Sequence, residues 1–141
     1  SASMNFDMIS FREFKFEDFY RKVNFHEKDE RCHICWNLRL AETAEYAAKN
    51  GFNGFTTTLL ISPYQEHERI KEIGNDTANK YSIPFIYEDF RTGFKESHRI
   101  SREMGLYHQK YCGCIYGERE QLLDKSSTVE QTNRRTDEPH I

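Results

Sequence analysis

The chain of 141 residues is poor in cysteine, proline and tryptophan, with four, three and one of them, respectively. No run approaches the roughly 18 apolar residues that a membrane-spanning helix needs. No segment has the charged start and apolar centre of a secretory signal. We therefore expect a cytoplasmic protein without a membrane partner. In that reducing compartment, closely spaced cysteines more often bind metal or take part in redox chemistry than form structural disulfides.

The sequence also lacks a strong excess of charge of either sign. Lys and Arg total 20 against 23 Asp and Glu, which gives a formal net charge of −3. This balance argues against a protein that binds nucleic acid through a globally basic surface, but it leaves room for a local basic patch. The length is typical of one domain that can bury a core.

The few cysteines that are present form two tight pairs. Cys32 and Cys35 form a CxxC motif, and Cys112 and Cys114 form a CxC motif. Such spacing can turn both sulfurs of a pair toward one metal ion or cluster. Two pairs that meet in space would supply four thiolates, which is the ligand set of a structural zinc or of an iron–sulfur cluster. Spacing alone does not separate zinc, an iron–sulfur cluster and a dithiol redox pair, so all three stay open.

Helical and extended segments alternate along the middle of the chain. The spacing of apolar residues predicts helices over about residues 18–23, 36–50, 65–81 and 95–104. Gly51 lies where a glycine would end the second of these helices, and Gly105 lies at the end of the fourth. The β-branched and apolar segments 55–61 and 83–87 predict two buried strands.

This order of elements predicts an α/β fold with a Rossmann-like layered parallel sheet and flanking helices. We expect this domain over residues 4–116. From Gly117 onward the chain is polar, so a short helix and then a disordered tail are expected over residues 117–141.

Ligands of open parallel sheets bind beyond the carboxyl ends of the strands. Thr56 to Thr58, Ser62 and Asp89 are expected at that edge. Asp89 can ligate a metal or move protons there, although a solvated loop carboxylate is the commoner explanation. His33, inside the CxxC motif, is expected to point away from the two cysteines. The segment 107–111 mixes tyrosines with a cation and an amide, which can stack on an RNA base or simply pack in a strand.

Several motifs occur in a specific order. They are Arg31-Cys32-x-x-Cys35-x-x-Leu38-Arg39-Leu40, Phe55-Thr56-Thr57-Thr58-Leu59-x-Ile61-Ser62-Pro63, Asp89-Phe90 and Gly105-Leu106-Tyr107-x-Gln109-x-Tyr111-Cys112-Gly113-Cys114. In this order and at this spacing, the chain resembles the epoxyqueuosine reductase QueH family from about Asp18 to Tyr116.

The resemblance implies an oxidoreductase of tRNA modification and queuosine biosynthesis. Such an enzyme reduces epoxyqueuosine at the tRNA wobble position to queuosine, with release of water. The implied partners are the anticodon loop of a queuosine-family tRNA and an unidentified electron donor. The implied cofactors are a 4Fe–4S cluster and an additional iron ion.

The resemblance also assigns residues to roles. Cys32, Cys35, Cys112 and Cys114 match the family's cysteine positions and are implied ligands of the cluster or metal. Asp89 is an implied oxygen ligand of the additional iron and a catalytic residue. Tyr107 and Gln109 are implied catalytic residues, and Tyr111 would line the site with them.

Family members begin with a strand and a loop that carries a Cys-Cys-x-x-Cys motif, which this sequence does not contain. The resemblance therefore implies the C-terminal portion of a family member, whose sheet would have an unpaired edge. The alternatives are a non-catalytic α/β module stabilised by zinc, or an inactive fragment of the reductase. A thiol–disulfide protein is a further alternative, but the expected order of strand, CxxC and helix is not evident.

Overall fold

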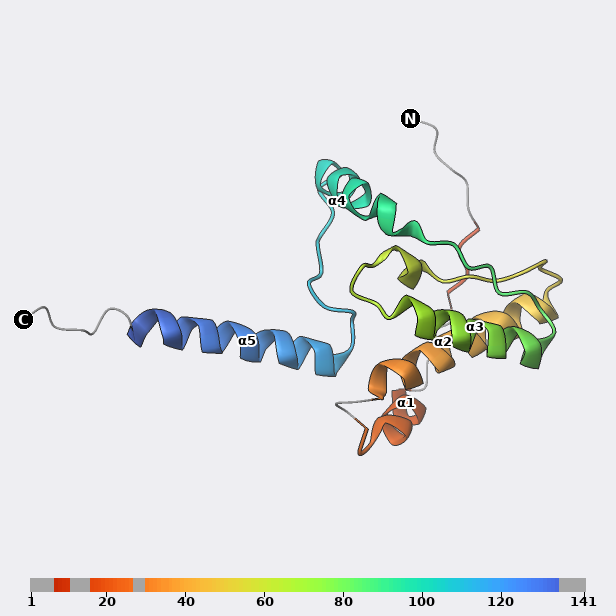
Figure 1. The fold of residues 1–141 in the computed structure, drawn as a ribbon, viewed down its shortest axis with the longest axis horizontal. Helices are drawn as coiled ribbons and strands as arrows, with labels where there is room; N and C mark the ends of the chain where they lie inside the picture. Colours follow the sequence, from red (N-terminus) through yellow and green to blue (C-terminus); the bar gives the residue numbers. More distant parts are fainter. Residues whose placement is uncertain (1–6, 11–15, 27–29, 135–141) are drawn as a thin grey trace, which may run out of the picture. The chain divides into compact units, whose positions relative to one another are not determined.

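A computed structural model describes residues 7–10, 16–26 and 30–134 (Figure 1). The chain divides into two compact units, Ser1–Asp89 and Phe90–Ile141, and each is described by itself. The first unit contains α1 (Phe16–Val23), α2 (Arg31–Lys49), the 3-10 helix η1 (Thr58–Ile61) and α3 (His67–Tyr81). The second contains the 3-10 helix η2 (Phe90–Gly93), α4 (Phe94–Glu103) and α5 (Ile115–Arg134). In the described parts of the chain, no helix combines the length and the apolar character that crossing a membrane requires.

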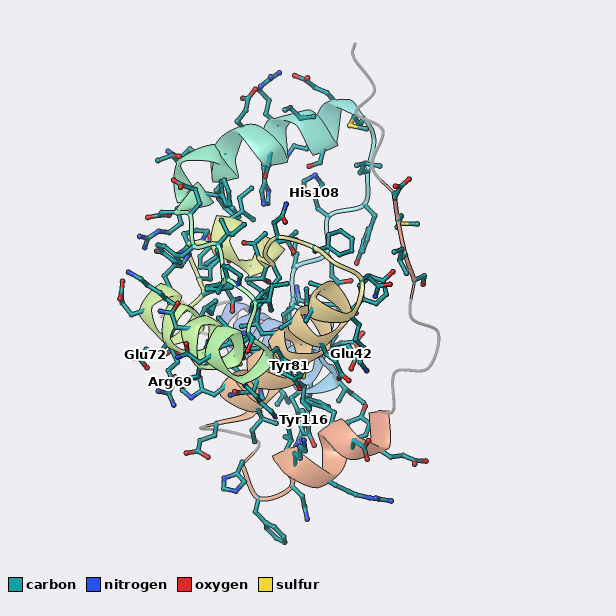
Figure 2. All side chains as sticks on the ribbon, turned by 90° about the vertical axis from the view of Figure 1, so that its right-hand side faces the viewer. Glu42, Arg69, Glu72, Tyr81, His108 and Tyr116 are labelled. Carbon is teal, nitrogen blue, oxygen red and sulfur yellow. The ribbon has the colours of Figure 1, made fainter. Side chains whose placement is uncertain are left out.

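The core of the first unit lies where α2 and α3 pack against each other, and α1 packs against α2 (Figure 1). Apolar residues of α2 recur at helical spacing, so one face of the helix is buried. The core residues are Trp36, Leu40, Ala44 and Ala47 of α2, Ile70 and Ile73 of α3, and Phe55, Leu60 and Ile83 of the connecting segments. The opposite face of α3 is solvated, and there Arg69 donates to Glu72 at 2.7 Å (Figure 2). Such exposed pairs contribute little to stability.

The predicted parallel sheet is wrong: among the described residues there is neither a strand nor a sheet. The two predicted strands do lie side by side, but they share one isolated parallel bridge between Phe55 and Phe85. The bridge consists of two hydrogen bonds, from Phe55 N–H to Pro84 O at 3.0 Å and from Ile86 N–H to Phe55 O at 2.8 Å. The Rossmann-like layered α/β architecture therefore gives way to a helical one.

Local side-chain chemistry explains why the pairing stops. The Thr57 hydroxyl accepts the Leu59 N–H at 3.3 Å and caps η1, so the chain turns into a 3-10 helix after a short extended stretch. Such local bonds compete with strand pairing. On the other segment, Pro84 has no N–H to donate. The β-branched composition of 55–61 thus predicts an extended conformation that the Thr57 cap interrupts.

The helix predictions are confirmed with shifted ends. α3 and α4 begin within two residues of the predicted starts, at His67 and Phe94. α2 begins at Arg31, five residues earlier than predicted, so the CxxC motif lies inside the helix. At its other end Gly51 has φ of 73°, and the Phe52 N–H reaches Ala47 O at 3.0 Å. This is the Schellman arrangement that a glycine in the left-handed region allows.

The second unit is built differently from the first. None of residues 90–124, whose side chains are described, is buried. His108 lies beside α4, where its Nε2 is 2.9 Å from Ser101 Oγ and its ring centroid is 5.1 Å from that of His98 (Figure 2). α5 extends to Arg134, well beyond the short helix expected near Gly117. Residues 135–141 of the expected tail lie outside the described residues.

Candidate functional site

The first cysteine pair lies at the start of α2. Cys32 and Cys35 are the second and fifth residues of this helix, so the spacing of three places them on one face. Cys32 is exposed and Cys35 is half-buried. Trp36, which follows directly, is part of the core and anchors this end of the helix. The pair is therefore presented from a rigid element at the edge of the core.

His33, between the two cysteines, faces the residue before α3. Its Nε2 lies 3.5 Å from Glu66 Oε1, and its ring centroid is 5.2 Å from that of Trp36. Glu66 occupies the N-cap position of α3, but its side chain makes no capping hydrogen bond. Its carboxylate instead faces the start of α2, so the His33–Glu66 contact joins the CxxC turn to α3.

The second cysteine pair immediately precedes α5. Gly113 between the two cysteines has φ of 90°, a left-handed conformation that favours glycine. The Cys114 carbonyl accepts the Glu118 N–H at 3.0 Å and so begins the helix. Cys112 is exposed and Cys114 is half-buried. Both pairs thus lie at a helix start, where the helix dipole favours anionic groups.

Two of the three residues expected to line the site lie beside the second pair. Gln109 Nε2 donates to Tyr111 O at 2.8 Å and lies 3.4 Å from the point where a Cβ on Gly113 would be. Tyr111 donates its hydroxyl to Glu118 Oε1 at 3.3 Å. Partial burial, followed by the charge and hydrogen bond of Glu118, raises the pKa of Tyr111 above its ordinary value. Tyr107 is 86% exposed, so its ring faces solvent.

Asp89 ends the first unit and is exposed. It follows the extended segment that contains the Phe85 bridge. The hydroxyls expected near it have structural roles: Thr56 Oγ1 donates to Ile86 O at 2.8 Å, and Thr57 caps η1. Of the predicted polar edge, Thr56 therefore joins the two extended segments and Thr57 begins η1.

Sequence reasoning missed His67, the first residue of α3. Its side chain is only 5% exposed, and it contacts Ser62 and Tyr87. A single histidine near a helix start has no distinctive sequence signal, because its burial depends on segments that meet only in the fold.

The donor chemistry of the cysteines fits a thiophilic metal, because each pair offers two sulfurs at close spacing. Among the described residues, no group of three or more His, Cys, Asp or Glu side chains is arranged to hold a metal ion. The two pairs belong to different units. A centre that combines all four cysteines therefore stays a prediction.

The structure defines a class of protein: a helical protein with two cysteine pairs, in each of which the cysteines are close in sequence and lie at the start of a helix. The family model described as epoxyqueuosine reductase QueH matches residues 1–120. The chain belongs to this family, and the resemblance found in its motifs is confirmed.

Curated relatives agree with the family match. The chain is 36% identical to the epoxyqueuosine reductase QueH of Dehalococcoides mccartyi over 122 residues, which cover 86% of the chain and 66% of the relative. It is 39% identical to the protein of that name from Thermotoga maritima over 111 residues, which cover 77% of the chain and 56% of that relative. It is 34% identical to the epoxyqueuosine reductase QueH of Streptococcus pyogenes over 100 residues, which cover 70% of the chain and 39% of that relative. The matched part is thus less than two thirds of the length of each of these relatives.

Proposed function

We propose that this chain carries part of the active site of an epoxyqueuosine reductase that acts on tRNA. The observation that carries the proposal is the family match over residues 1–120, which includes both cysteine pairs. Reduction of an epoxide to an alkene breaks two C–O bonds and forms a C=C bond. It consumes two electrons and two protons, and the oxygen leaves as water. The electrons must come from an external donor.

In this proposal Cys32, Cys35, Cys112 and Cys114 hold a 4Fe–4S cluster, and Asp89 holds an additional iron. Thiolates suit the cluster, whereas a carboxylate suits an iron that takes oxygen ligands. When bound, such groups supply electrons one at a time and Lewis acidity. The position of each pair at a helix start supports the assignment, because backbone N–H groups there stabilise anionic ligands.

The residues beside the second pair would bind the modified nucleoside. The exposed Tyr107 ring can stack on a base that is turned out of an RNA loop. The Gln109 amide, whose NH₂ group already donates to Tyr111 O, retains its oxygen as a hydrogen-bond acceptor. An anticodon loop of a queuosine-family tRNA would present such a base. We therefore assign Tyr107 and Gln109 to substrate binding and orientation.

The proposal is tested by metal analysis and turnover on one anaerobic preparation. The chain is reconstituted with iron and sulfide, and its iron, zinc and visible spectrum are measured. Conversion of epoxyqueuosine-containing tRNA is then followed with a chemical one-electron reductant. Several irons per chain, a brown chromophore and formation of queuosine are expected. One zinc without colour or turnover would instead support a metal-stabilised, non-catalytic module.

A matched variant separates the cysteines from general effects of oxidation or unfolding. Cys32→Ser with Cys35→Ser should lose the chromophore and the turnover together. Ser97→Ala removes a hydroxyl that donates to Phe94 O within α4, at 3.1 Å, and should change neither the chromophore nor the turnover. Turnover that survives the double cysteine variant would contradict the assigned role of this pair.

A further inference from the structure

His67 is a buried, polar contact point at the start of α3. Ser62 O is a carbonyl oxygen and can only accept, so His67 Nε2–H donates to it, at 3.0 Å. The other ring nitrogen, Nδ1, then accepts from the Tyr87 hydroxyl at 3.4 Å. The Tyr87 ring stands edge-on to the His67 ring, with centroids 6.3 Å apart. One side chain thus connects the loop after η1, the start of α3 and the segment that leads to Asp89.

The same helix start also reaches the CxxC turn. Glu66 directly precedes His67, and its carboxylate lies 3.5 Å from His33 Nε2. Glu66 is exposed and does not cap α3, so this contact is not a by-product of helix capping. Because Glu66 is bonded to the buried His67, its backbone carbonyl side is held where α3 begins.

We propose that His67 and Glu66 are positioning residues for the Cys32/Cys35 pair. His67, held between Ser62 and Tyr87, fixes the start of α3, and Glu66 from there restrains His33 between the two cysteines. Metal ligands depend on outer contacts for their orientation. Glu66 acts here through His33, which lies between the two ligands, so we expect a smaller effect than that of a group bonded directly to a ligand. The proposal rests on the proposed function, in that the pair is taken to bind metal.

Co²⁺ titration of the full, reduced chain tests this positioning without turnover. The thiolate-to-Co²⁺ charge-transfer band reports both the affinity and the number of thiolates bound. Glu66→Gln removes the charge at an exposed position and should weaken Co²⁺ binding about threefold, the effect of one exposed ion pair. Glu68→Gln, two residues further along α3 and also exposed, is its matched control and should bind Co²⁺ like the original chain.

Tyr87→Phe tests the hydrogen bond between Tyr87 and His67 without leaving a cavity, because the ring is retained. It removes the hydroxyl that bonds His67 and should weaken Co²⁺ binding about threefold, the effect of one ordinary hydrogen bond. Tyr81→Phe is the control, since Tyr81 is also half-buried against the core but lies at the other end of α3 (Figure 2). Tyr81 lies 14 positions after His67, or about 20 Å along the helix.

A double variant distinguishes positioning from general destabilisation. The chain that carries both Glu66→Gln and Tyr87→Phe is compared with Glu66→Gln alone. If Tyr87 acts through Glu66, the second substitution has nothing left to disturb, and the two chains should bind Co²⁺ equally. Losses that multiply, or a Glu66→Gln chain that binds like Glu68→Gln, would overturn the proposal. An original chain that binds no Co²⁺ would overturn it too, because no thiolate pair would then bind metal. Normal Co²⁺ results without turnover on tRNA would contradict only the proposed function.

Discussion

The sulfur of Cys112 lies 3.4 Å from the point that a Cβ atom on Gly117 would occupy. Gly117 is the third residue of α5, so the second cysteine pair rests against the first turn of its own helix. A methyl group at 3.4 Å is in ordinary van der Waals contact, whereas a larger branched side chain would reach into the space of the sulfur.

Gly117→Ala should therefore stabilise α5 without disturbing Cys112. Replacing glycine by alanine inside a helix contributes up to about 1 kcal/mol. Gly117→Val should instead displace the Cys112 sulfur and lower the Co²⁺ affinity of the chain. Helix content by circular dichroism and Co²⁺ titration measure the two effects. Equal Co²⁺ affinities of the Ala and Val variants would show that this contact does not affect the pair.

Gly74→Ala should destabilise the first unit. Gly74 is buried in α3, and a Cβ there would lie 2.3 Å from Phe85 Cδ1, too close for the ring to keep its position. Because Phe85 forms the bridge to Phe55, its displacement should also loosen the pairing of the two extended segments. Overpacking of this kind typically costs about 1–3 kcal/mol.

Thermal unfolding of the Gly74→Ala chain measures this cost. Gly93→Ala is the matched control, since nothing lies within 4 Å of a Cβ added at Gly93. An unfolding temperature that falls equally in both variants would contradict the argument from Phe85.

The sequence predicts the helices of the first unit well because their signals are local. Apolar spacing marks α3, and Gly51 marks the end of α2. The start of α2 is harder to predict, since Glu30 at its N-cap makes no side-chain capping bond. The sheet prediction fails for a different reason: the composition of 55–61 favours strands, but the hydroxyl of Thr57 and the missing N–H of Pro84 decide the outcome locally.

The candidate site is predictable only in part, for a related reason. The spacing of each cysteine pair follows from adjacent residues, so the pairing is visible in the sequence. The contact of His33 with Glu66 joins residues 33 positions apart and depends on the packing of α2 against α3. The burial of His67 likewise depends on Tyr87, from a segment 20 residues away.

Glu118→Gln should lower the pKa of Tyr111. Partial burial is the largest cause of the raised pKa of Tyr111, and the charge and hydrogen bond of Glu118 add to it. The variant removes the charge of Glu118 but not the burial, so the pKa should fall and still stay above its ordinary value. The neutral phenol is favoured in the folded chain. Stability from Tyr111 is therefore fully present below the ordinary pKa of about 10 and is lost as the pH rises through the raised value.

Tyrosinate absorption measures the pKa in an alkaline titration. Subtracting the absorption curve of Tyr111→Phe from that of the original chain leaves the titration of Tyr111 alone. The same subtraction is made for chains that also carry Glu118→Gln. Identical difference curves in the two backgrounds would contradict the role of Glu118.

Asp89→Asn should abolish turnover of epoxyqueuosine-containing tRNA and leave the cysteine centre intact. The amide keeps the size of the side chain but is a poor ligand for iron, so the proposed additional iron would be lost. The visible spectrum of the proposed cluster should be unchanged, because the variant retains all four cysteines. Iron analysis, the visible spectrum and a turnover assay on the same preparation measure the three properties separately.

Glu88→Gln is the matched control for Asp89→Asn, because the neighbouring carboxylate is also exposed. It should keep both the iron content and the turnover. If Asp89→Asn loses the cluster absorption as well, Asp89 supports the thiolate centre or the fold and is no ligand of a separate iron. If both variants retain turnover, the oxygen ligand must come from elsewhere, and the assignment of Asp89 fails.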